Sequence, residues 1–322
     1  MSSQTNAEPA DINMMMCFCA SCGVTGGDET KKLKRCTACK LVHYCSVKCQ
    51  KEHRPQHKRA CKKRATELRD EILFRRPASS NCGDCPICCL PLSLDPKKCR
   101  IMGCCSKTVC HGCDFTKQIS ELKQARKQTC SFCRHPSPET QAELDQIRLK
   151  RIETNDPLAL RETGLKQRDK GNYISAFEYY TKAADLGDVE AHFHLCASYA
   201  LGQGVEMNEK KKFYHMEKAA IEGHVKARFN LGIRELNLGV NEGKVGSFER
   251  AAKHFIIAAN LGCFKSMEKL KQCYENGLIS KEDYTVALRA HHDILDAMKS
   301  PQRDAAEESL RNEWFIPTFN VD

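Results

Sequence analysis

The sequence predicts a mainly α-helical protein, an α-solenoid of two-helix repeats that follows two small cysteine-rich modules. Two observations support this fold class. Nineteen of the 22 cysteines lie between Cys17 and Cys133. Beyond them, Lys-Ala-Ala-Asp-Leu-Gly (182–187), Lys-Ala-Ala-Ile-Glu-Gly (218–223) and Ile-Ala-Ala-Asn-Leu-Gly (257–262) repeat one pattern. A cysteine-rich half therefore precedes a repetitive half.

The start of the chain predicts the redox environment of these cysteines. Residues 1–13 are polar and lack the basic start and apolar run of a signal peptide. No window approaches eighteen apolar residues, so no membrane segment is expected. Clustered cysteines in such a chain bind metal more often than they form disulfides. We therefore expect a protein of the cytosol or nucleus.

The first cluster, in residues 17–61, offers seven cysteines and one histidine in four closely spaced pairs, and its eighth cysteine, Cys17, is expected to be a spare thiol. The pairs are Cys19 with Cys22, Cys36 with Cys39, Cys45 with Cys49, and His57 with Cys61. Two ligands two or three residues apart can reach one tetrahedral ion, because a tight turn or one helical turn brings them together. Eight ligands fill two Zn²⁺ ions and leave no position for a reactive water. We therefore expect structural and not catalytic zinc.

This order of residues resembles the MYND-type zinc finger. The resemblance rests on Tyr44-Cys45, Cys49-Gln50 and the run His57-Lys58-Arg59-Ala60-Cys61. It implies interleaved ligands, with one zinc ion on Cys19, Cys22, Cys45 and Cys49 and a second on Cys36, Cys39, His57 and Cys61. MYND fingers that hold proline-rich peptides usually carry a Trp after the position of His53, where this chain has Arg54. Peptide binding by this finger therefore stays open, and His53 itself is expected to be a solvated helix residue.

A basic helical linker (62–81) is expected to lead to a second cluster in residues 82–136. Its candidate ligands are Cys85, Cys88, Cys104, Cys105, Cys110, Cys113, Cys130 and Cys133, whereas Cys82 and Cys89 are expected to be spare thiols. Three pairs with two intervening residues and one adjacent doublet can again supply eight ligands. Between the later pairs, Phe115, Ile119 and Leu122 have helical spacing. The cluster therefore predicts two further zinc ions around one helix.

Cys-Pro-Ile-Cys (85–88) and Cys-Ser-Phe-Cys-Arg (130–134) resemble a RING-type finger. The resemblance implies a cross-brace, with one zinc ion on Cys85, Cys88, Cys110 and Cys113 and the other on Cys104, Cys105, Cys130 and Cys133. RING ubiquitin ligases act by positioning a ubiquitin-conjugating enzyme. In that family the enzyme's loop binds at the place of Ile87, and a guanidinium at the place of Arg134 bridges ubiquitin and the conjugating enzyme by hydrogen bonds.

The doublet Cys104-Cys105 departs from the RING pattern, which has Cys-x-His there. Adjacent residues of an extended chain point in opposite directions, so one zinc ion can take both only at a sharp turn. Cys99 is the alternative ligand. With these two resemblances, the fold class is an α-solenoid preceded by two cross-brace zinc-finger modules.

After a helical linker (137–155), the repeats are expected over 156–300, in units 156–187, 188–223, 224–262 and 263–300. Paired alanines let helices approach closely, and a glycine after each pair suits a left-handed cap. The pattern resembles Sel-one-like repeats, relatives of tetratricopeptide repeats, although the first unit looks more like a plain tetratricopeptide unit. Such solenoids bind peptides or partner proteins. Residues 301–322 are expected to form a cap or tail, with Trp314 covering the last repeat.

Charge helps to select among functions. Residues 31–76 carry sixteen Lys/Arg against four Asp/Glu, but thiolates on zinc offset much of this surplus. Few aromatic residues interleave with the basic ones, so nucleic-acid binding is not expected. Redox catalysis is disfavoured because the Cys-x-x-Cys pairs come in ligand sets, and no segment is left for a methyltransferase domain. Two functions stay open: a RING-type ubiquitin ligase whose repeats select a partner, and a non-catalytic scaffold.

Overall fold

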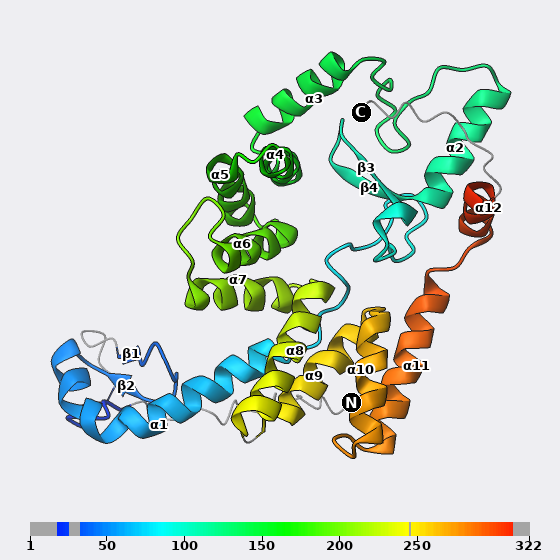
Figure 1. The fold of residues 1–322 in the computed structure, drawn as a ribbon. Helices are drawn as coiled ribbons and strands as arrows, with labels where there is room; N and C mark the ends of the chain where they lie inside the picture. Colours follow the sequence, from blue (N-terminus) through cyan, green and yellow to red (C-terminus); the bar gives the residue numbers. More distant parts are fainter. Residues whose placement is uncertain (1–17, 26–32, 245, 312–322) are drawn as a thin grey trace, which may run out of the picture. The chain divides into compact units, whose positions relative to one another are not determined.

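The computed structural model describes residues 18–25, 33–244 and 246–311, which are mainly helical (Figure 1). The chain divides into two compact units, one ending at Leu73 and the other beginning at Phe74. Twelve α-helices and four short strands occur in the described residues. None of these helices combines the length and the apolar character needed to cross a membrane.

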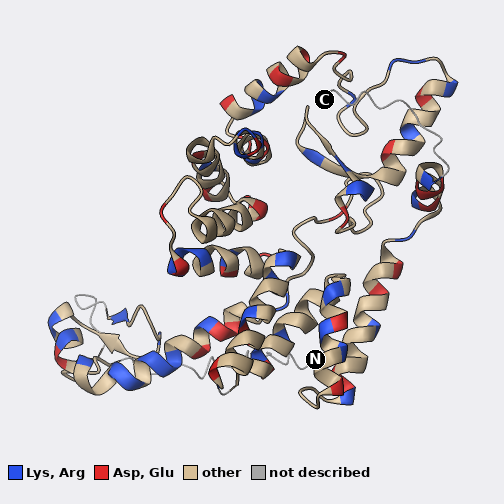
Figure 2. Cartoon of the chain, viewed as in Figure 1, with Lys and Arg blue, Asp and Glu red and all other residues tan. Residues whose placement is uncertain are grey.

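The first unit consists of a short hairpin and one long helix. Strand β1 (Lys34–Arg35) pairs antiparallel with β2 (His43–Tyr44), and α1 (Val47–Leu73) follows. Figure 2 shows basic residues along α1, with acidic residues among them towards its C-terminal end. The buried core is made of four cysteines and one aromatic ring: Cys19, Cys36, Cys39, Tyr44 and Cys49. Because so small a core cannot hold a fold by apolar burial alone, the cysteines themselves must contribute the stability.

The second unit begins with another cysteine-rich module. A short 3₁₀ helix, η1 (Pro96–Lys98), leads into β3 (Cys99–Met102), which pairs antiparallel with β4 (Lys107–Cys110). Helix α2 (His111–Lys123) starts where β4 ends. Apart from cysteines, the buried core of this module holds Leu92, Met102 and Val109. The helix predicted from the spacing of Phe115, Ile119 and Leu122 is therefore present as α2.

The rest of the second unit is a stack of helices. The helices are α3 (Gln141–Glu153), α4 (Pro157–Asp169), α5 (Tyr173–Asp185), α6 (Val189–Leu201), α7 (Glu209–Ile221), α8 (Val225–Glu242), α9 (Ser247–Asn260), α10 (Phe264–Glu275) and α11 (Lys281–Ala297). Helices α4 and α5, α6 and α7, and α8 and α9 pack as hairpins, and each hairpin packs on the next. The predicted solenoid of two-helix units is confirmed.

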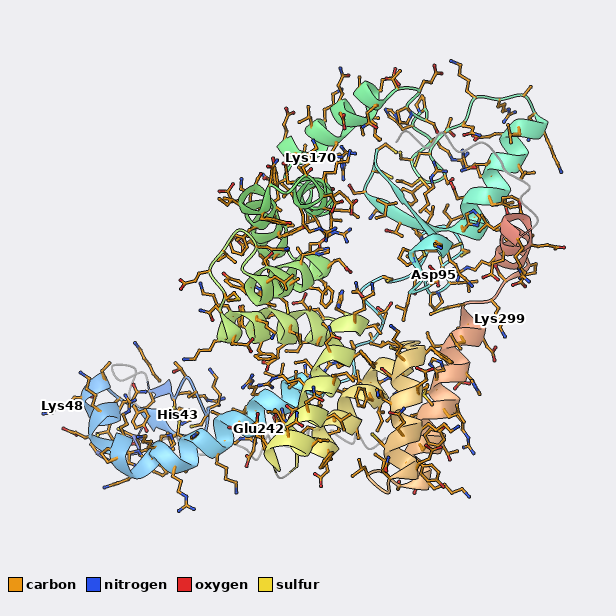
Figure 3. All side chains as sticks on the ribbon, viewed as in Figure 1. His43, Lys48, Asp95, Lys170, Glu242 and Lys299 are labelled. Carbon is orange, nitrogen blue, oxygen red and sulfur yellow. The ribbon has the colours of Figure 1, made fainter. Side chains whose placement is uncertain are left out.

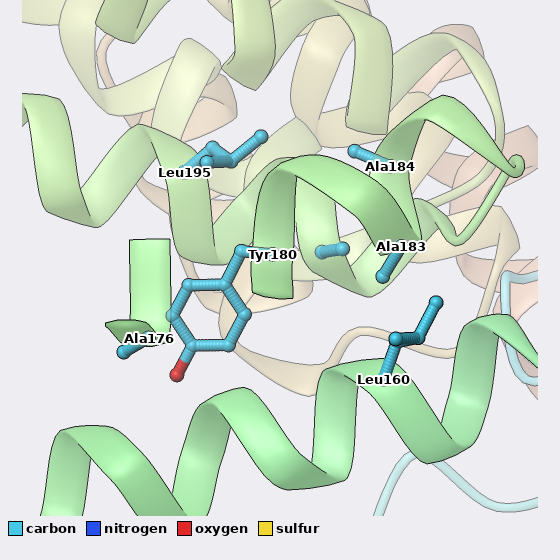
Figure 4. Packing of buried hydrophobic residues seen from close by; sticks show 7 residues of the cluster. Leu160, Ala176, Tyr180, Ala183, Ala184 and Leu195 are labelled. Atoms are coloured by element: carbon cyan, nitrogen blue, oxygen red, sulfur yellow. The ribbon is translucent and has the colours of Figure 1, made fainter. Parts of the chain in front are cut away.

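Local sequence explains why each unit folds as a helical hairpin. The first helix of a unit is capped by a side chain that accepts the N–H group three residues on, as Asp156, Asp188 and His224 do. Within a hairpin, small residues admit an aromatic ring. Tyr180 of α5 lies among Leu160, Ala176 and Ala183 (Figure 4). Its ring atoms would lie 2.7 Å from a Cβ placed on Gly164 of α4, so only glycine allows this approach.

The last helix leaves the solenoid and packs on the second cysteine-rich module. Helix α12 (Pro301–Arg311) contacts α2. The approach is close, because a Cβ on Gly112 of α2 would lie 2.7 Å from the backbone nitrogen of Arg303. At the other end of the solenoid, Ser106 Oγ donates to Asp156 Oδ1 at 2.8 Å. The module therefore contacts both the first repeat and the segment after the last one. The predicted cap residue Trp314 lies outside the described residues.

Candidate metal centres

Four groups of metal-ligating side chains lie in the described part of the chain. Within each group all ligand atoms lie within 4.8 Å of one another. The groups are Cys19, Cys22, Cys45 and Cys49; Cys36, Cys39, His57 and Cys61; Cys85, Cys88, Cys110 and Cys113; and Cys104, Cys105, Cys130 and Cys133. The structure thus brings together the same four sets that the two family resemblances imply.

The first centre joins a turn to the start of α1. The chain turns after Cys19, whose N–H donates to Val24 O at 2.8 Å. Cys45 precedes α1 and Cys49 lies in its first turn. Cys45 Sγ lies 3.6 Å from Cys22 Sγ and 3.5 Å from Cys49 Sγ. One ion can therefore contact sulfurs from both segments.

The second centre joins the β1–β2 hairpin to the middle of α1. Cys36 Sγ lies 3.8 Å from Cys61 Sγ, and Cys39 Sγ lies 3.2 Å from His57 Nε2. His57 and Cys61 are one helical turn apart, so they present their donors on one face of α1. The two centres take alternate ligand pairs along the chain, which is the interleaved arrangement expected.

His53 corrects one expectation. It is half-buried rather than solvated, and its Nδ1 lies 3.0 Å from the Tyr44 hydroxyl. Its ring also stacks on that of His57, with centroids 5.4 Å apart. His53 therefore supports the metal-ligating histidine and the buried tyrosine without being a ligand itself. The spacing of His53 and His57, four residues apart, was the only signal of this contact in the sequence.

The third centre is built where β4 becomes α2. Cys88 Sγ lies 3.8 Å from Cys110 Sγ, and the Cys110 N–H donates to Cys85 Sγ at 3.4 Å. A side chain from far along the sequence also reaches this centre. Arg303 of α12 donates from Nη2 to Cys88 Sγ at 3.5 Å and from Nη1 to Pro91 O at 2.7 Å. No spacing pattern in the sequence pointed to Arg303.

The fourth centre contains the adjacent pair Cys104-Cys105. A sharp turn follows β3, in which the N–H of Cys105 donates to Met102 O at 3.2 Å. Cys104 Sγ then lies 3.3 Å from Cys133 Sγ, and Cys105 Sγ lies 3.8 Å from Cys130 Sγ. Cys99 instead directs its thiol to Ser93 O at 3.6 Å. The turn that the doublet required is present, and Cys99 is outside the group.

The acidity of the thiols is uneven within each centre. Burial raises the pKa of Cys19, but backbone N–H groups, foremost that of Cys22, outweigh it and lower the pKa to about 6. The same balance lowers the pKa of Cys36 to about 6 and that of Cys85 to about 7. Hydrogen bonding to Cys49 raises the pKa of Cys45 to about 12. Several thiolates can therefore coexist in one centre only with a cation between them, because their mutual repulsion is otherwise uncompensated.

The two candidate partner-binding residues line one groove beside the third centre. Ile87 is 43% exposed and Arg134 is exposed. They line a cavity of about 540 Å³ together with Lys117 and Glu121 of α2, its C-cap residue Gln124, and Gln302 of α12. Lys117 also donates to Thr129 O at 2.7 Å, which ties the loop before Arg134 to α2.

Family models match the first cysteine-rich module and most of the helical repeats. A MYND finger model matches residues 19–61, and a Sel1 repeat model matches 158–188, 189–224 and 225–263. The first helical repeat (158–188) therefore matches the Sel1 pattern as well, contrary to the expectation of a plain tetratricopeptide unit. No family model matches the second cysteine-rich module. The helices α10 and α11 form the remaining predicted unit beyond the three matched repeats.

Curated relatives share only a short segment with this chain. "SET domain and MYND-type zinc finger protein 6" of Schizosaccharomyces pombe is 42% identical over 55 residues, which are 17% of this chain and 11% of that protein. "Histone-lysine N-methyltransferase SMYD3" of Homo sapiens is 56% identical over 32 residues, 10% of this chain and 8% of that protein. The chain thus spans about a tenth of the length of these relatives.

Two solved structures also match about half of this chain. A Sel1 repeat protein from Oxalobacter formigenes is 20% identical with a TM-score of 0.42, covering 56% of this chain and 52% of that one. The antigen c5321 of uropathogenic Escherichia coli, described as an SLR fold, is 17% identical with a TM-score of 0.29, covering 53% and 48%. The family models show that this chain contains a MYND-type zinc finger and three Sel1 repeats, and hence a zinc-binding module and a protein-interaction module.

Proposed function

We propose that this protein binds four zinc ions and assembles other proteins, with its repeats selecting a partner and its second finger recruiting a ubiquitin-conjugating enzyme. The observation that carries the second part is the groove shared by Ile87 and Arg134. Ile87 lies between Cys85 and Cys88 of the third centre, and Arg134 directly follows Cys133 of the fourth. The zinc ions would thereby fix the two loops that present them.

The donor sets fit zinc. Three centres offer four thiols each, and the other offers three thiols and an imidazole, the ligand types that structural Zn²⁺ prefers. Four protein donors leave no position for a reactive water, so zinc would supply folding stability and not hydrolysis. In small fingers this contribution is on the order of 10–16 kcal/mol. The core of the first unit, in which four buried cysteines and Tyr44 have only partly buried aliphatic side chains around them, agrees with such a role.

Ligase action would need no catalytic side chain from this protein. A conjugating enzyme already carries ubiquitin as a thioester, and catalysis consists of holding that thioester in a reactive orientation. The exposed Ile87 side chain would bury apolar surface of the enzyme. The Arg134 guanidinium would donate charge-assisted hydrogen bonds to both proteins. Lys117 and Glu121 in the same groove would add polar contacts.

A non-catalytic scaffold is the second candidate, and α12 favours it. This helix packs against α2, and its Gln302 forms part of the groove wall. Arg303 further binds the loop after Cys88. The second finger would then serve to join the ends of the solenoid, and the groove would be too confined for a conjugating enzyme.

Auto-ubiquitination of the zinc-loaded protein with a panel of conjugating enzymes distinguishes the two functions. We expect ubiquitin chains that depend on Ile87, so Ile87→Ala should lose most of the activity. The matched control is Ile101→Ala, since Ile101 is similarly exposed on β3 but does not line the groove. Elemental analysis of the same sample should give four zinc ions per chain. Equal activity of both variants would contradict ligase docking at Ile87, and no activity with any enzyme would favour the scaffold.

A further inference from the structure

A second groove lies within the solenoid, between α7 and α8. Its volume is about 370 Å³, and its polar lining comes mostly from one helix. That helix, α8, has 18 residues, whereas the corresponding helix α6 of the preceding repeat has 13 and ends at Leu201, before its C-cap Gly202. The additional turn continues to Glu242, which is labelled in Figure 3. This extension supplies Leu238, Asn241 and Glu242 to the groove.

The groove carries a row of side-chain amides. Asn230, Asn237 and Asn241 line it together with Arg234. Their spacing of four, three and four residues places all of them on one face of α8. All three amides are exposed, and none is hydrogen-bonded to another described residue. Each amide offers two N–H donors and one carbonyl acceptor, the same pairing that a peptide backbone offers in return.

A cation is held at the centre of this row. The Arg234 guanidinium carbon lies 3.9 Å from the centroid of the Phe213 ring, and Lys212 Nζ lies 4.8 Å from it. The buried carboxylate of Glu235 accepts from Arg250 Nε at 3.1 Å, and Arg234 Nη1 lies 3.8 Å from the same oxygen, beyond hydrogen-bond distance. Lys212 Nζ donates one hydrogen bond to Glu209 Oε1 at 2.8 Å, which leaves two of its three N–H groups for a ligand. Stacking on Phe213 fixes the plane of the guanidinium, which reduces the conformational entropy lost when it binds a carboxylate.

Apolar side chains complete the groove. Met216 of α7 and Ile233 and Leu238 of α8 line it beside the amides. A methionine and two branched aliphatic chains accept an apolar side chain of a ligand. An inorganic anion would use the two cations but neither the carbonyl acceptors nor the apolar wall. The combination of donors, acceptors, cations and apolar surface matches a peptide.

We propose that this groove binds an extended peptide in which an acidic side chain lies next to an apolar one. The carboxylate binds Arg234 and Lys212, the apolar side chain lies against Met216 and Ile233, and the amides of Asn237 and Asn241 pair with the peptide backbone. This inference rests on the proposed role of the repeats in selecting a partner, and it names the chemistry of that partner.

The test uses the full-length, zinc-loaded protein and three pools of capped, fluorescein-labelled nonapeptides. The pools share randomised neutral flanks and differ only at the centre, which is Glu-Leu, Gln-Leu or Lys-Leu. Fluorescence anisotropy should give an affinity for the Glu-Leu pool about tenfold above that for the Gln-Leu pool, the effect of one charge-assisted hydrogen bond. The Lys-Leu pool should bind weakest. The preference should decrease at high salt.

Two variants locate the binding. Arg234→Gln should abolish the preference for Glu over Gln, and the double variant Asn237→Ala, Asn241→Ala should weaken all three pools. Alanine favours helix more than asparagine does, so weaker binding by the double variant would not reflect an unfolded helix. Lys226→Ala is the matched control, because it removes an exposed charge from α8 outside the groove.

Each outcome decides the inference. Equal binding of the Glu-Leu and Lys-Leu pools, or no binding of any pool, would overturn it. A Glu-Leu preference that persists in both groove variants would overturn the location while leaving a peptide-binding solenoid in place. Failure here is also separable from failure of the ubiquitination assay, because Ile87 and this groove lie on different elements and are changed independently.

Discussion

At the scale of single residues, Arg303 forms hydrogen bonds to residues 212 to 215 positions earlier in the described part of the chain. Its guanidinium donates to Pro91 O at 2.7 Å, Met298 O at 2.8 Å and Leu90 O at 3.2 Å. Three carbonyl oxygens thus depend on one side chain, together with a cysteine of the third metal centre. A buried acceptor that loses its donor costs roughly 1–3 kcal/mol.

Arg303→Ala should therefore destabilise the second unit by about 1–3 kcal/mol and hasten zinc release to a chelator. Urea unfolding followed by circular dichroism measures the first effect, and a colorimetric zinc indicator measures the second. Arg311→Ala, in the same helix but with a mostly exposed side chain, should change neither. Equal behaviour of the two variants would show that Arg303 does not stabilise the finger.

His254 predicts how stability depends on pH. The side chain is buried, and burial together with Arg228, Arg250 and Arg234 lowers its pKa to about 3 from 6.5. The unfolded chain therefore takes up a proton below pH 6.5 that the folded chain does not. Stability present above pH 6.5 should be lost as pH falls from 6.5 towards 3, by about 1.4 kcal/mol per pH unit for this group.

His254→Gln should flatten this dependence. Unfolding free energies measured between pH 7.5 and about pH 5.5, where only the upper part of the window is used, should show a smaller slope for the variant. His292→Gln is the comparison, because His292 is exposed on α11. An unchanged slope in His254→Gln would mean that other groups account for the pH dependence.

At the scale of elements, close helix packing decides which glycines the solenoid needs. Gly232 of α8 faces Phe255 of α9, and a Cβ there would lie 2.6 Å from the ring. Phe255 is fully buried among the residues of its cluster, so the ring has no room to move. Gly239 lies about two turns further along the same face of α8. A Cβ on Gly239 would lie 2.9 Å from the ring of Phe248.

Gly232→Ala should destabilise the solenoid by roughly 1–3 kcal/mol through overpacking, even though alanine raises helix propensity by about 1 kcal/mol. Adding Phe255→Leu should recover part of this loss relative to Phe255→Leu alone, because the smaller side chain leaves space for the new methyl group. Asn230→Ala, an exposed position on the same helix, should be neutral or slightly stabilising. Chemical denaturation of the four variants tests the coupling.

The elements also show what the sequence could and could not predict. Metal ligands come in short-range pairs, so spacing such as that of Cys85 and Cys88 was sufficient to predict the pairs. The grouping of these pairs into four sets came from the resemblance to MYND and RING fingers. That they bind zinc as assigned stays a prediction. The packing of α12 on α2 was not predictable, because Arg303 and its partners share no local pattern. The groove of α8 was not predictable either, because no spacing pattern indicates that the helix continues through Gly239, a buried residue that admits Phe248.

At the scale of the whole molecule, the second finger is coupled to the solenoid at both ends of the helical stack. Ser106 donates to Asp156, which also caps α4, and Asn81 donates to Glu190 Oε2 at 3.1 Å at the start of α6. Lys98 pairs with Glu307 of α12. These contacts couple metal binding in the second cysteine-rich module to the stability of the helices that it contacts.

Removal of zinc by a chelator should consequently loosen helices that contain no metal ligand. Hydrogen exchange should accelerate in α12 and at the start of α4, and less in the hairpin of α8 and α9, which contacts its own neighbours. Re-addition of zinc should restore protection. Acceleration confined to residues 18–61 and 82–136 would show that the finger and the solenoid are energetically independent.

The contact between Arg303 and the loop after Cys88 can form only late in synthesis of the chain. The bonded residues are 212 to 215 positions apart, which at roughly 5–20 residues per second takes a ribosome on the order of 10–40 s. For most of that interval, once synthesis has passed Cys133, all the cysteines of the second cysteine-rich module are present, but α12 does not yet exist to cover α2. Metal can therefore bind before the covering helix is made, and any protein that requires the uncovered face of α2 meets it most readily on the nascent chain.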